Sequence, residues 1–419
     1  MFLFFQLRYY TTLYLSEQIG NNAFMLQKMI TLKPGREKPI LAGHPWIFSM
    51  GIEKDAEAER GELVEVQTSE GRFLGVGTYS PGNSIRVRII SREKLEKLDK
   101  DFFVGRLLAL DKLKREFLPE GTNGYRIVHA DADYLPGLIL DKYNDVFVFQ
   151  AHTAGMDIVK LELIEAIKEV FSPRGIVERS DLEIRKMEGL EHIKPMIHFG
   201  EIDGLVMFEE SGIKFFVEVL AGQKTGFFLD QREARRKIGE LSKGKKVLNL
   251  FSYTGAFGLY SALAGAEKVT TVDISAKAVE MAKENFKLNG LDLGSDKYDF
   301  VVADVFDFLN SPAAKGYDLI VCDPPAFAKA GARVEQALWA YTDLSKKCLE
   351  LLKQGGILLA SSCSGRVSMD EFRSVLRIAG GKSGRDVRVL ASLGQALDHT
   401  DRLCFIEGRY LKTLIVEVL

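Results

Sequence analysis

Two short segments combine residue types that could form a catalytic crevice. Asp323-Pro324-Pro325-Ala326-Phe327 follows an apolar run typical of a buried strand, and Ser362-Cys363-Ser364-Gly365 follows another, with Cys363 forty residues after Asp323. A cysteine is often only a small hydrophobic residue of the core. Here the polar flanks and Gly365 indicate the point at which a parallel strand opens into a loop. The pattern therefore favours a thiol that faces a crevice.

A thiol in such a crevice suggests methyl transfer to a pyrimidine ring. C5 of the neutral ring is a poor nucleophile, but a thiolate that adds at C6 turns C5 into an enamine carbon, and loss of the C5 proton later expels the thiol. The two prolines would hold Asp323 in the crevice, where it could hydrogen-bond the ring or transfer a proton, while Phe327 could stack on a base. A pocket-lining or core thiol is the alternative reading of Cys363.

The end of an earlier strand predicts a cofactor site. Residues 247–251 read as a buried strand that runs into a small-residue turn around Gly255 and then into a helix, so the backbone could approach a ligand closely. Asp273 ends the next predicted strand, twenty-four residues after Asn249, a spacing that suits a carboxylate accepting from ribose hydroxyls. A tight packing turn followed by a solvated Asp is the alternative.

A third strand end adds an acid and a hydrophobic residue. Asp304 could accept from the amino group of adenine and Val305 could lie against its ring, although an Asp at such a place is also a common helix N-cap. The dinucleotide fingerprint GxGxxG does not occur in the sequence, which disfavours NAD. Together the three strand ends make S-adenosylmethionine the predicted cofactor.

Strict alternation of strands and helices after Gly244 would bring these strand ends to one edge of a sheet. Seven predicted strands, with helical patterns between the first six, imply a doubly wound α/β sheet with right-handed crossovers and a ligand crevice at the carboxyl ends of the strands. We expect the strands at residues 247–251, 269–273, 300–303, 319–322, 357–361, 387–391 and 414–418. Residues 220–419 would form this Rossmann-like domain.

Two other units precede this domain. Short, regularly spaced strands predict a small β-barrel over residues 27–95. Arg86 and Arg88 share one face of its last strand, where they could contact phosphate or simply form a solvated face. A charged helical linker, followed by strands around an amphipathic helix, predicts a central α+β domain over residues 96–219.

Composition sets the broad class of protein. A chain of 419 residues fits two or three domains, and 46% hydrophobic with 27% charged residues indicates a globular protein. A net charge of -2 does not exclude a local basic groove. The four cysteines show no disulfide or zinc pattern, so we expect a reducing, cytoplasmic setting and no metal. The first fifteen residues are apolar but are interrupted by Gln6 and Arg8, and they are too short for a membrane span. We expect residues 1–24 to be a disordered or mis-assigned extension, with a targeting segment or a helix as alternatives.

At these residues the chain resembles the bacterial 23S ribosomal RNA cytosine-5 methyltransferases that carry an N-terminal PUA domain. The resemblance runs from about Met25 to Leu419, and its marks are His44-Pro45-Trp46-Ile47-Phe48, Gly222-Gln223-Lys224-Thr225-Gly226-Phe227-Phe228-Leu229-Asp230-Gln231-Arg232, residues 249–258, residues 323–327 and Ser362-Cys363-Ser364-Gly365. It implies an RNA-binding PUA β-barrel, a central α+β domain and a class I methyltransferase domain with Cys363 as nucleophile. It also implies that S-adenosylmethionine lies over Asn249, Phe251, Tyr253, Thr254, Gly255, Asp273, Asp304 and Asp323.

Several alternatives remain open at this point. Lys224 and Arg232 could belong to a lid over the substrate or cofactor, or their segment could be a connector capped by Asp230. Relatives that share the Leu229-Asp230-Gln231-Arg232 segment include guanine methyltransferases, in which case Cys363 would be idle. A non-catalytic RNA-binding assembly factor on the same scaffold is a further alternative. The expected partner is ribosomal RNA, naked or in a partly assembled subunit, and a homodimer is compatible with the sequence.

Overall fold

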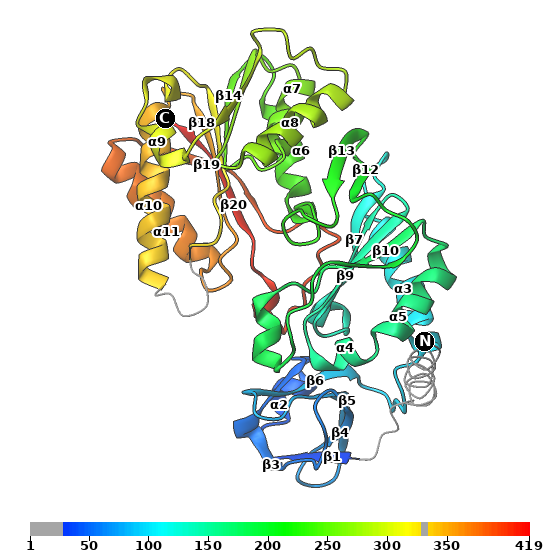
Figure 1. Ribbon diagram of the computed structural model, residues 1–419. Helices are drawn as coiled ribbons and strands as arrows, with labels where there is room; N and C mark the ends of the chain where they lie inside the picture. The colour runs from blue at the N-terminus through cyan, green and yellow to red at the C-terminus, as the bar shows by residue number, and fades with distance from the viewer. Residues whose placement is uncertain (1–27, 328–333) are drawn as a thin grey trace, which may run out of the picture.

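The computed structural model describes residues 28–327 and 334–419, which form three units along a curved molecule (Figure 1). The N-terminal unit, drawn in blue, lies at one end, the seven-stranded sheet of the C-terminal unit at the other, and the central unit between them. The expectation for residues 1–24 falls outside the described residues. Within the described part of the chain, no helix combines the length and apolar character needed to cross a membrane.

The N-terminal unit is a six-stranded sheet with strand order β2-β6-β5-β4-β1-β3. Side chains such as Val64, Val66, Val87 and Ile89 alternate with more exposed neighbours, because successive residues of a strand point to opposite faces. The strands are β1 (Lys28–Leu32), β2 (Trp46–Phe48), β3 (Ile52–Lys54), β4 (Leu63–Gln67), β5 (Phe73–Tyr79) and β6 (Ile85–Ser91), with the short helix α2 (Lys38–Leu41).

The central unit is a five-stranded sheet with order β11-β10-β9-β8-β7, packed against α3 (Lys100–Arg115) and α5 (Lys160–Phe171). Between β8 and β9, Asn144 has a φ of 57°, in the left-handed region that Asn readily adopts in a tight hairpin turn. The remaining elements are β7 (Gly124–His129), β8 (Leu138–Tyr143), β9 (Val146–Ala151), α4 (Ala154–Ile158), β10 (Gly175–Glu178) and β11 (Met196–Phe199).

A hairpin of β12 (Leu205–Glu210) and β13 (Ile213–Glu218) bridges the central and C-terminal units. Phe208 and Phe215 lie in one core with Leu259 of the C-terminal unit, and the backbone amide of Phe216 donates to Asn285 Oδ1 at 2.8 Å. The sequence pattern placed these strands with the central module. Their packing shows that they are also part of the core that supports the C-terminal sheet.

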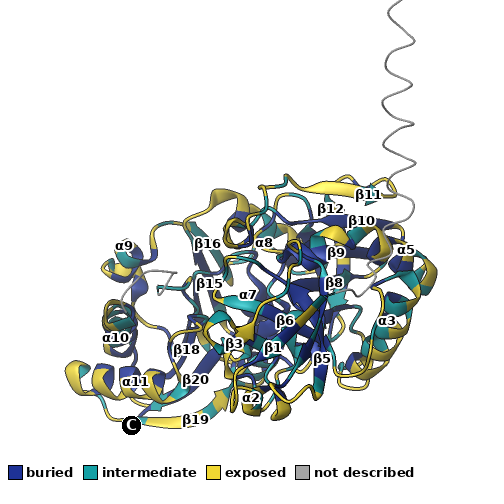
Figure 2. Cartoon of the chain, turned by 90° about the horizontal axis from the view of Figure 1, so that it is seen from below, coloured by how far each residue is buried: buried dark blue, intermediate teal, exposed yellow. Residues whose placement is uncertain are grey.

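The C-terminal unit is a seven-stranded sheet with order β16-β15-β14-β17-β18-β20-β19. The helices α7 and α8 pack on one face of this sheet and α10 and α11 on the other, which leaves its central strands buried (Figure 2). All seven predicted strands are present, as β14 (Lys246–Leu250), β15 (Lys268–Asp273), β16 (Tyr298–Val302), β17 (Leu319–Cys322), β18 (Ile357–Ser362), β19 (Val387–Leu393) and β20 (Lys412–Val418). The helices are α6 (Arg232–Leu241), α7 (Ala256–Leu263), α8 (Ala276–Leu288), α9 (Val305–Leu309), α10 (Val334–Leu351) and α11 (Met369–Ser383).

The last strand departs from a fully parallel arrangement. β20 pairs antiparallel with both β18 and β19, because residues 394–411 return the chain beside β19 without a crossover helix. We call residues 394–411 the β19–β20 connection. In Figure 1 it runs, in orange to red, from the C-terminal sheet toward the two other units.

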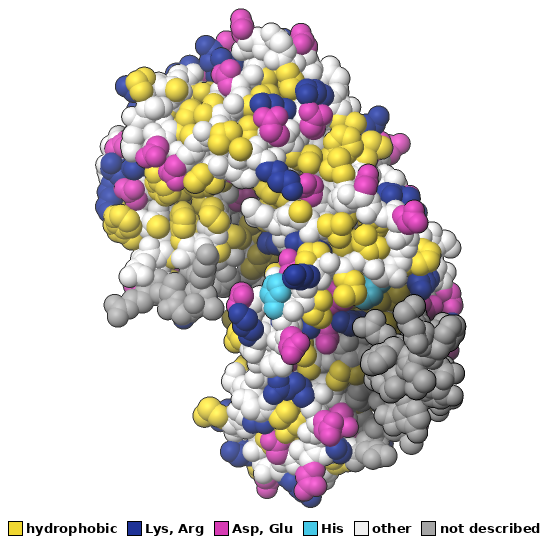
Figure 3. All heavy atoms as spheres, viewed as in Figure 1, with side chains coloured by type: hydrophobic (Ala, Val, Ile, Leu, Met, Phe, Trp, Pro, Cys, Tyr) yellow, Lys and Arg dark blue, Asp and Glu magenta, His cyan; other side chains and the backbone are white. Residues whose placement is uncertain are grey.

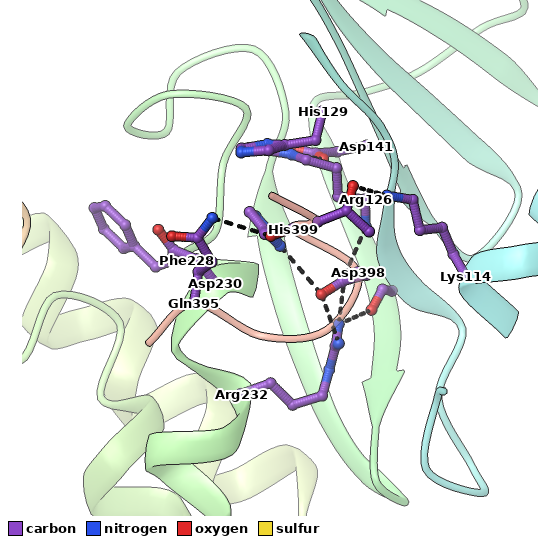
Figure 4. Close-up of polar contacts among 12 residues, drawn as sticks. Lys114, Arg126, His129, Asp141, Phe228, Asp230, Arg232, Gln395, Asp398 and His399 are labelled. Atoms are coloured by element: carbon purple, nitrogen blue, oxygen red, sulfur yellow. Dashed lines mark hydrogen bonds and ion pairs between the residues drawn. The ribbon is translucent and has the colours of Figure 1, made fainter. Parts of the chain in front are cut away.

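Buried polar contacts attach the β19–β20 connection to the central unit and to α6 (Figure 4). Asp398 accepts from the backbone amide of Arg126 at 2.9 Å and from Arg232 Nη2 at 3.1 Å, and its carboxylate is fully buried. Farther along, Thr400 Oγ1 accepts from Lys114 Nζ at 2.7 Å. These contacts fix a segment that would otherwise be a long surface loop.

Aromatic contacts attach the same connection to the N-terminal unit. The rings of Trp46 and Phe405 have centroids 4.8 Å apart in an edge-to-face arrangement, and His44 Nε2 lies 3.6 Å from Glu407 Oε2. The β19–β20 connection therefore contacts all three units, and it determines how the N-terminal unit is held relative to the C-terminal sheet.

We expect Asp398→Ala to lower the free energy of unfolding by about 3–5 kcal/mol, because it leaves the buried Arg232 guanidinium without its closest anion at the connection. Urea unfolding measures the change. The matched control is Arg388→Ala, which removes an exposed pair with Glu417 at 2.8 Å and should cost less than about 1 kcal/mol. Equal losses in the two variants would contradict the assigned role of Asp398.

Candidate active site

The turn after β14 has a backbone that few residues adopt. Phe251, Tyr253 and Gly255 all have positive φ, at 53°, 47° and 77°. Two non-glycine residues in the left-handed region within three positions indicate a strained turn, which is typical of ligand sites. Gly255 also packs closely, because a Cβ there would lie 2.7 Å from the Cβ of Ala282 on α8. The predicted turn and its glycine are confirmed.

Buried polar atoms around this turn lack partners within the described residues. They are both side-chain atoms of Asn249 and the hydroxyls of Ser252, Thr254 and Thr271. Such atoms cost free energy unless a ligand or water pairs with them. Their gathering at the ends of β14 and β15 fits a polar cofactor, as the sequence predicts for S-adenosylmethionine.

The two predicted cofactor carboxylates are both oriented by backbone amides. Asp273 Oδ2 accepts from the amide of Tyr253 at 2.8 Å and Oδ1 from that of Ser275 at 2.9 Å, which holds the carboxylate at the strand end with lone pairs to spare. Asp304 Oδ1 accepts from the amide of Phe306 at 2.8 Å, so the N-cap reading of Asp304 is correct. Its contact with adenine stays a prediction.

Apolar side chains near the ends of β15 and β16 bear on the predicted adenine contact. Val305 is the first residue of α9 and is 3% exposed within the core, and its contact with adenine stays a prediction. Ile274 and Val302, at the ends of β15 and β16, are 68% and 52% exposed. Apolar side chains left uncovered at this edge offer a surface for adenine. In the sequence, the position of Ile274 directly after Asp273 is the feature that could have indicated this apolar surface.

The two predicted catalytic residues directly follow β17 and β18, which are neighbouring parallel strands. Gln231 Nε2 donates to Asp323 Oδ1 at 3.0 Å. Burial raises the pKa of Asp323 to about 7, and the nearby charge of Asp230 adds to the effect. Burial also raises the pKa of the Cys363 thiol, followed by the charge of Asp323. Cys363 is partly exposed, whereas Cys322 and Cys348 are buried in the core.

Asp230 is a second carboxyl group close to Asp323, and the sequence interpretation considered it only as a helix cap. Tyr410 Oη donates to Asp230 Oδ2 at 2.6 Å, and Lys224 Nζ lies 3.9 Å from the same oxygen. The carboxyl is buried, which raises its pKa, but Lys224, His399 and the Tyr410 hydroxyl outweigh burial and bring the pKa to about 2. It does not cap α6, as the connector reading required, because the N-cap of that helix is Gln231.

Lys412 secures the loop that carries the thiol. It is 3% exposed, and its Nζ donates to the backbone oxygens of Ser364 at 2.6 Å and Tyr410 at 2.7 Å. Burial lowers the pKa of Lys412 to about 8, and the charge of Cys363 opposes that fall. The register pairs Lys412 with Ser362 across β20 and β18, so the antiparallel last strand places this cation beside the cysteine loop.

Phe327 is the last described residue before the gap at 328–333. Its ring lies 4.8 Å from that of Tyr341, at an interplanar angle of 50°, and Tyr341 Oη lies 2.9 Å from Ser364 Oγ. Tyr341 therefore links the two catalytic segments. The predicted stacking of Phe327 on a base stays a prediction.

The predicted RNA-contacting cations lie in different settings. Lys224 is half-exposed, with Nζ 4.6 Å from the ring centroid of Phe228 at the edge of the catalytic centre. Arg232 is 1% exposed between Glu210 and Asp398, a placement that gives no support to contact with RNA. Arg86 and Arg88 are mostly buried and ion-paired with Asp55 and Glu188, so their phosphate contacts likewise stay predictions.

Comparison with known proteins identifies the class. A family model described as "S-adenosylmethionine-dependent methyltransferase" matches residues 200–374, and one described as "PUA-like domain" matches residues 30–92. The protein is thus an S-adenosylmethionine-dependent methyltransferase with an N-terminal PUA-like domain and a Rossmann-like catalytic domain.

Full-length relatives define the family. The chain is 41% identical to "Ribosomal RNA large subunit methyltransferase I" of Shewanella amazonensis, over 93% of this chain and 99% of that protein, and 40% identical to the protein of the same name from Aeromonas salmonicida, over 92% and 98%. The chain belongs to the ribosomal RNA large subunit methyltransferase I family.

A solved structure agrees with the fold. A SAM-dependent methyltransferase from Streptococcus mutans is 25% identical and superposes with a TM-score of 0.79, over 94% of this chain and all of that one. A solved methyltransferase in complex with SAH, the demethylated cofactor, has the same TM-score and identity. The placement of the cofactor beside the unpaired polar atoms at the ends of β14 and β15 stays a prediction.

We expect Ile274→Ala to weaken the binding of S-adenosylhomocysteine about 10-fold, because it removes apolar area from the predicted adenine surface. Isothermal titration calorimetry measures the affinity. Ile378→Ala on α11, where the side chain is 40% exposed, is the matched control and should leave the affinity unchanged. A wild-type affinity for Ile274→Ala would place the adenine elsewhere.

We expect Asp323→Asn to raise the free energy of unfolding at pH 8 by about 1–3 kcal/mol. The pKa of Asp323 is raised in the folded protein from 3.8 to about 7, so ionisation costs stability as pH rises from about 4 to about 7. The amide avoids that cost and can still accept from Gln231. Urea unfolding at pH 4.5 and pH 8 should therefore show a larger gain at pH 8, and a gain independent of pH would refute the raised pKa.

Proposed function

We propose that this protein is a methyltransferase that forms 5-methylcytidine in large-subunit ribosomal RNA through a covalent bond between Cys363 and C6 of the base. The supporting observation is the placement of a partly exposed thiol in one crevice with Asp323 and Asp230, at the strand ends that fit the cofactor. The ribosomal substrate is supported by the names of the relatives and by the PUA-like domain. The need for a reduced thiol suits an enzyme of the cytoplasm.

The chemistry divides between the cofactor and the protein. S-adenosylmethionine supplies an electrophilic methyl group on a sulfonium. Cys363 adds to C6 as a thiolate, forming the S–C6 bond and moving electron density to C5 and N3. C5 then takes the methyl group, the bond between that methyl and the sulfonium breaks, and S-adenosylhomocysteine leaves. Loss of the C5 proton restores the C5–C6 double bond and expels the thiolate, and N3 gives back any proton that it received. Each step conserves electrons without a redox partner.

The two carboxyl groups have unlike protonation states, and this suits them to different roles. Asp323, with a pKa of about 7, holds a proton over much of the neutral range and can donate it to N3 of the cytosine. Asp230, with a pKa of about 2, stays ionised and can accept the C5 proton. Gln231 orients Asp323 through its 3.0 Å hydrogen bond. This arrangement favours a ring with a basic N3, as cytosine has.

Lys224 and Lys412 would assist formation of the thiolate. The charge of Lys224 lowers the pKa of Cys363 against the effects of burial and of the two acids. Lys412 fixes the loop around the thiol through the carbonyl of Ser364. Because the net shift of the thiol pKa is upward, the rate of the covalent step should increase with pH until Asp323 ionises.

We expect Cys363→Ala to lower methyl transfer to ribosomal RNA by about 1,000-fold or more, since the route through C6 is lost. The measurement is transfer of labelled methyl groups to unmodified large-subunit ribosomal RNA, with mapping of the modified nucleotide by mass spectrometry. Cys404→Ala, which alters the other partly exposed cysteine, is the matched control and should retain activity. Binding of S-adenosylhomocysteine should be the same in both variants.

The outcomes separate the competing functions. Full transfer by Cys363→Ala, with the methyl group on a guanine, would replace the proposal by a guanine methyltransferase on the same scaffold. Absence of transfer by the wild-type protein on naked RNA and on isolated subunits would favour a non-catalytic assembly factor.

A further inference from the structure

A cavity of about 810 Å³ lies beside the catalytic loop, and the proposed mechanism does not use it. Its wall is formed by residues 365–369, which follow Cys363, and by parts of the β19–β20 connection. The volume is within the range of roughly 300–1,000 Å³ that is typical of ligand pockets. We propose that this cavity holds an unstacked RNA base next to the methylated nucleotide, an inference that rests on the proposed function.

The place of the cavity points to RNA adjacent to the target. Gly365 and Lys412 line it, and Lys412 Nζ donates to the carbonyl of Ser364, so the cavity shares a wall with the cysteine loop. On its other side Glu407 lies 3.6 Å from His44 of the PUA-like domain. A strand that runs from that domain to Cys363 passes the cavity, and Figure 3 shows the molecule hollowed between the two domains.

The lining fits the face of a base. Leu397 and Ile406 are 57% and 70% exposed, and Phe117 from the central domain is 46% exposed. These side chains come from two domains and are uncovered at one cavity, which is unusual for apolar groups unless a partner packs on them. RNA proteins commonly bind unstacked bases on apolar or aromatic side chains.

The charges around the cavity favour a base over a phosphate. Asp401 and Glu407 line it, and each is paired, with Arg409 at 2.5 Å and with His44 at 3.6 Å. Of the lining cations, Arg409 is thus engaged by Asp401, and the buried Lys412 Nζ donates to the carbonyls of Ser364 and Tyr410, so neither is free to attract a phosphate. Gln395 donates from Nε2 to the carbonyls of His399 and Gly408, which keeps this wall in place.

The first test truncates the apolar wall. We expect the double variant Leu397→Ala with Ile406→Ala to bind an unmodified transcript of large-subunit ribosomal RNA about 10-fold more weakly. Because phosphate contacts are unaffected, the dependence of affinity on salt should keep its slope. Filter binding with S-adenosylhomocysteine present, at several salt concentrations, measures both quantities without requiring methyl transfer.

The chain offers a matched control. Leu403 belongs to the same connection and is 91% exposed, but it does not line the cavity. Leu403→Ala should therefore bind the transcript as the wild-type protein does. Thermal melting and binding of S-adenosylhomocysteine verify that each variant is folded, which is expected because all three side chains are exposed.

The second test identifies the occupant. In a short RNA centred on the methylated nucleotide, an abasic site at the adjacent position should weaken wild-type binding by a similar factor. It should cause little further loss in the double variant, because the two changes remove the same contact. Unchanged affinity of the double variant, or full additivity with abasic sites on both sides, would overturn the proposal and leave a protein partner as the occupant.

This inference can fail separately from the proposed function. RNA affinity does not depend on which atom is methylated, so a guanine product or an active Cys363→Ala variant would leave the binding test intact. Conversely, confirmed 5-methylcytidine formation with unaltered binding by the double variant would reject the cavity alone.

Discussion

The active site depends on a buried network of charges that closes the β19–β20 connection onto the central domain. Asp398 joins Arg232 to the backbone of Arg126, while Arg235 pairs with Glu210 through two hydrogen bonds of 2.7 Å. Such charges are costly to bury, and removal of one partner leaves the others uncompensated. These contacts hold the polar β19–β20 connection in place. Tyr410, near its end, thereby reaches Asp230, and Lys412, which begins β20, reaches the loop that carries Cys363.

The proposed catalytic centre contains two carboxyl groups whose surroundings shift their pKa values in opposite directions. Asp230 and Asp323 lie close enough to interact, yet the pKa of one is lowered and that of the other is raised. The difference arises because Tyr410 donates to Asp230 and Lys224 lies beside it, whereas the hydrogen bond that Asp323 accepts within the described residues comes from the neutral amide of Gln231. A pair of carboxyl groups thereby acquires one proton donor and one anion at neutral pH.

The predicted cofactor region is marked by two local features of the turn after β14. The turn after β14 has two non-glycine residues with positive φ and several buried polar atoms without partners in the described chain. Both features reduce stability in the absence of a ligand. Their concentration at one strand end is consistent with a binding region in which the ligand supplies the missing interactions.

The amino-acid sequence by itself determined the seven strands, the glycine turn, and the placement of Asp323 and Cys363 directly after strands, because strand periodicity and strand-end residues are local properties of the chain. It could not pair Asp230 with Tyr410 or place Arg232 in the interior. Those outcomes depend on which segments pack together. Tertiary structure decided them through the antiparallel return of β20 and the connection before it, since contacts such as Tyr410 with Asp230 join residues far apart in the sequence.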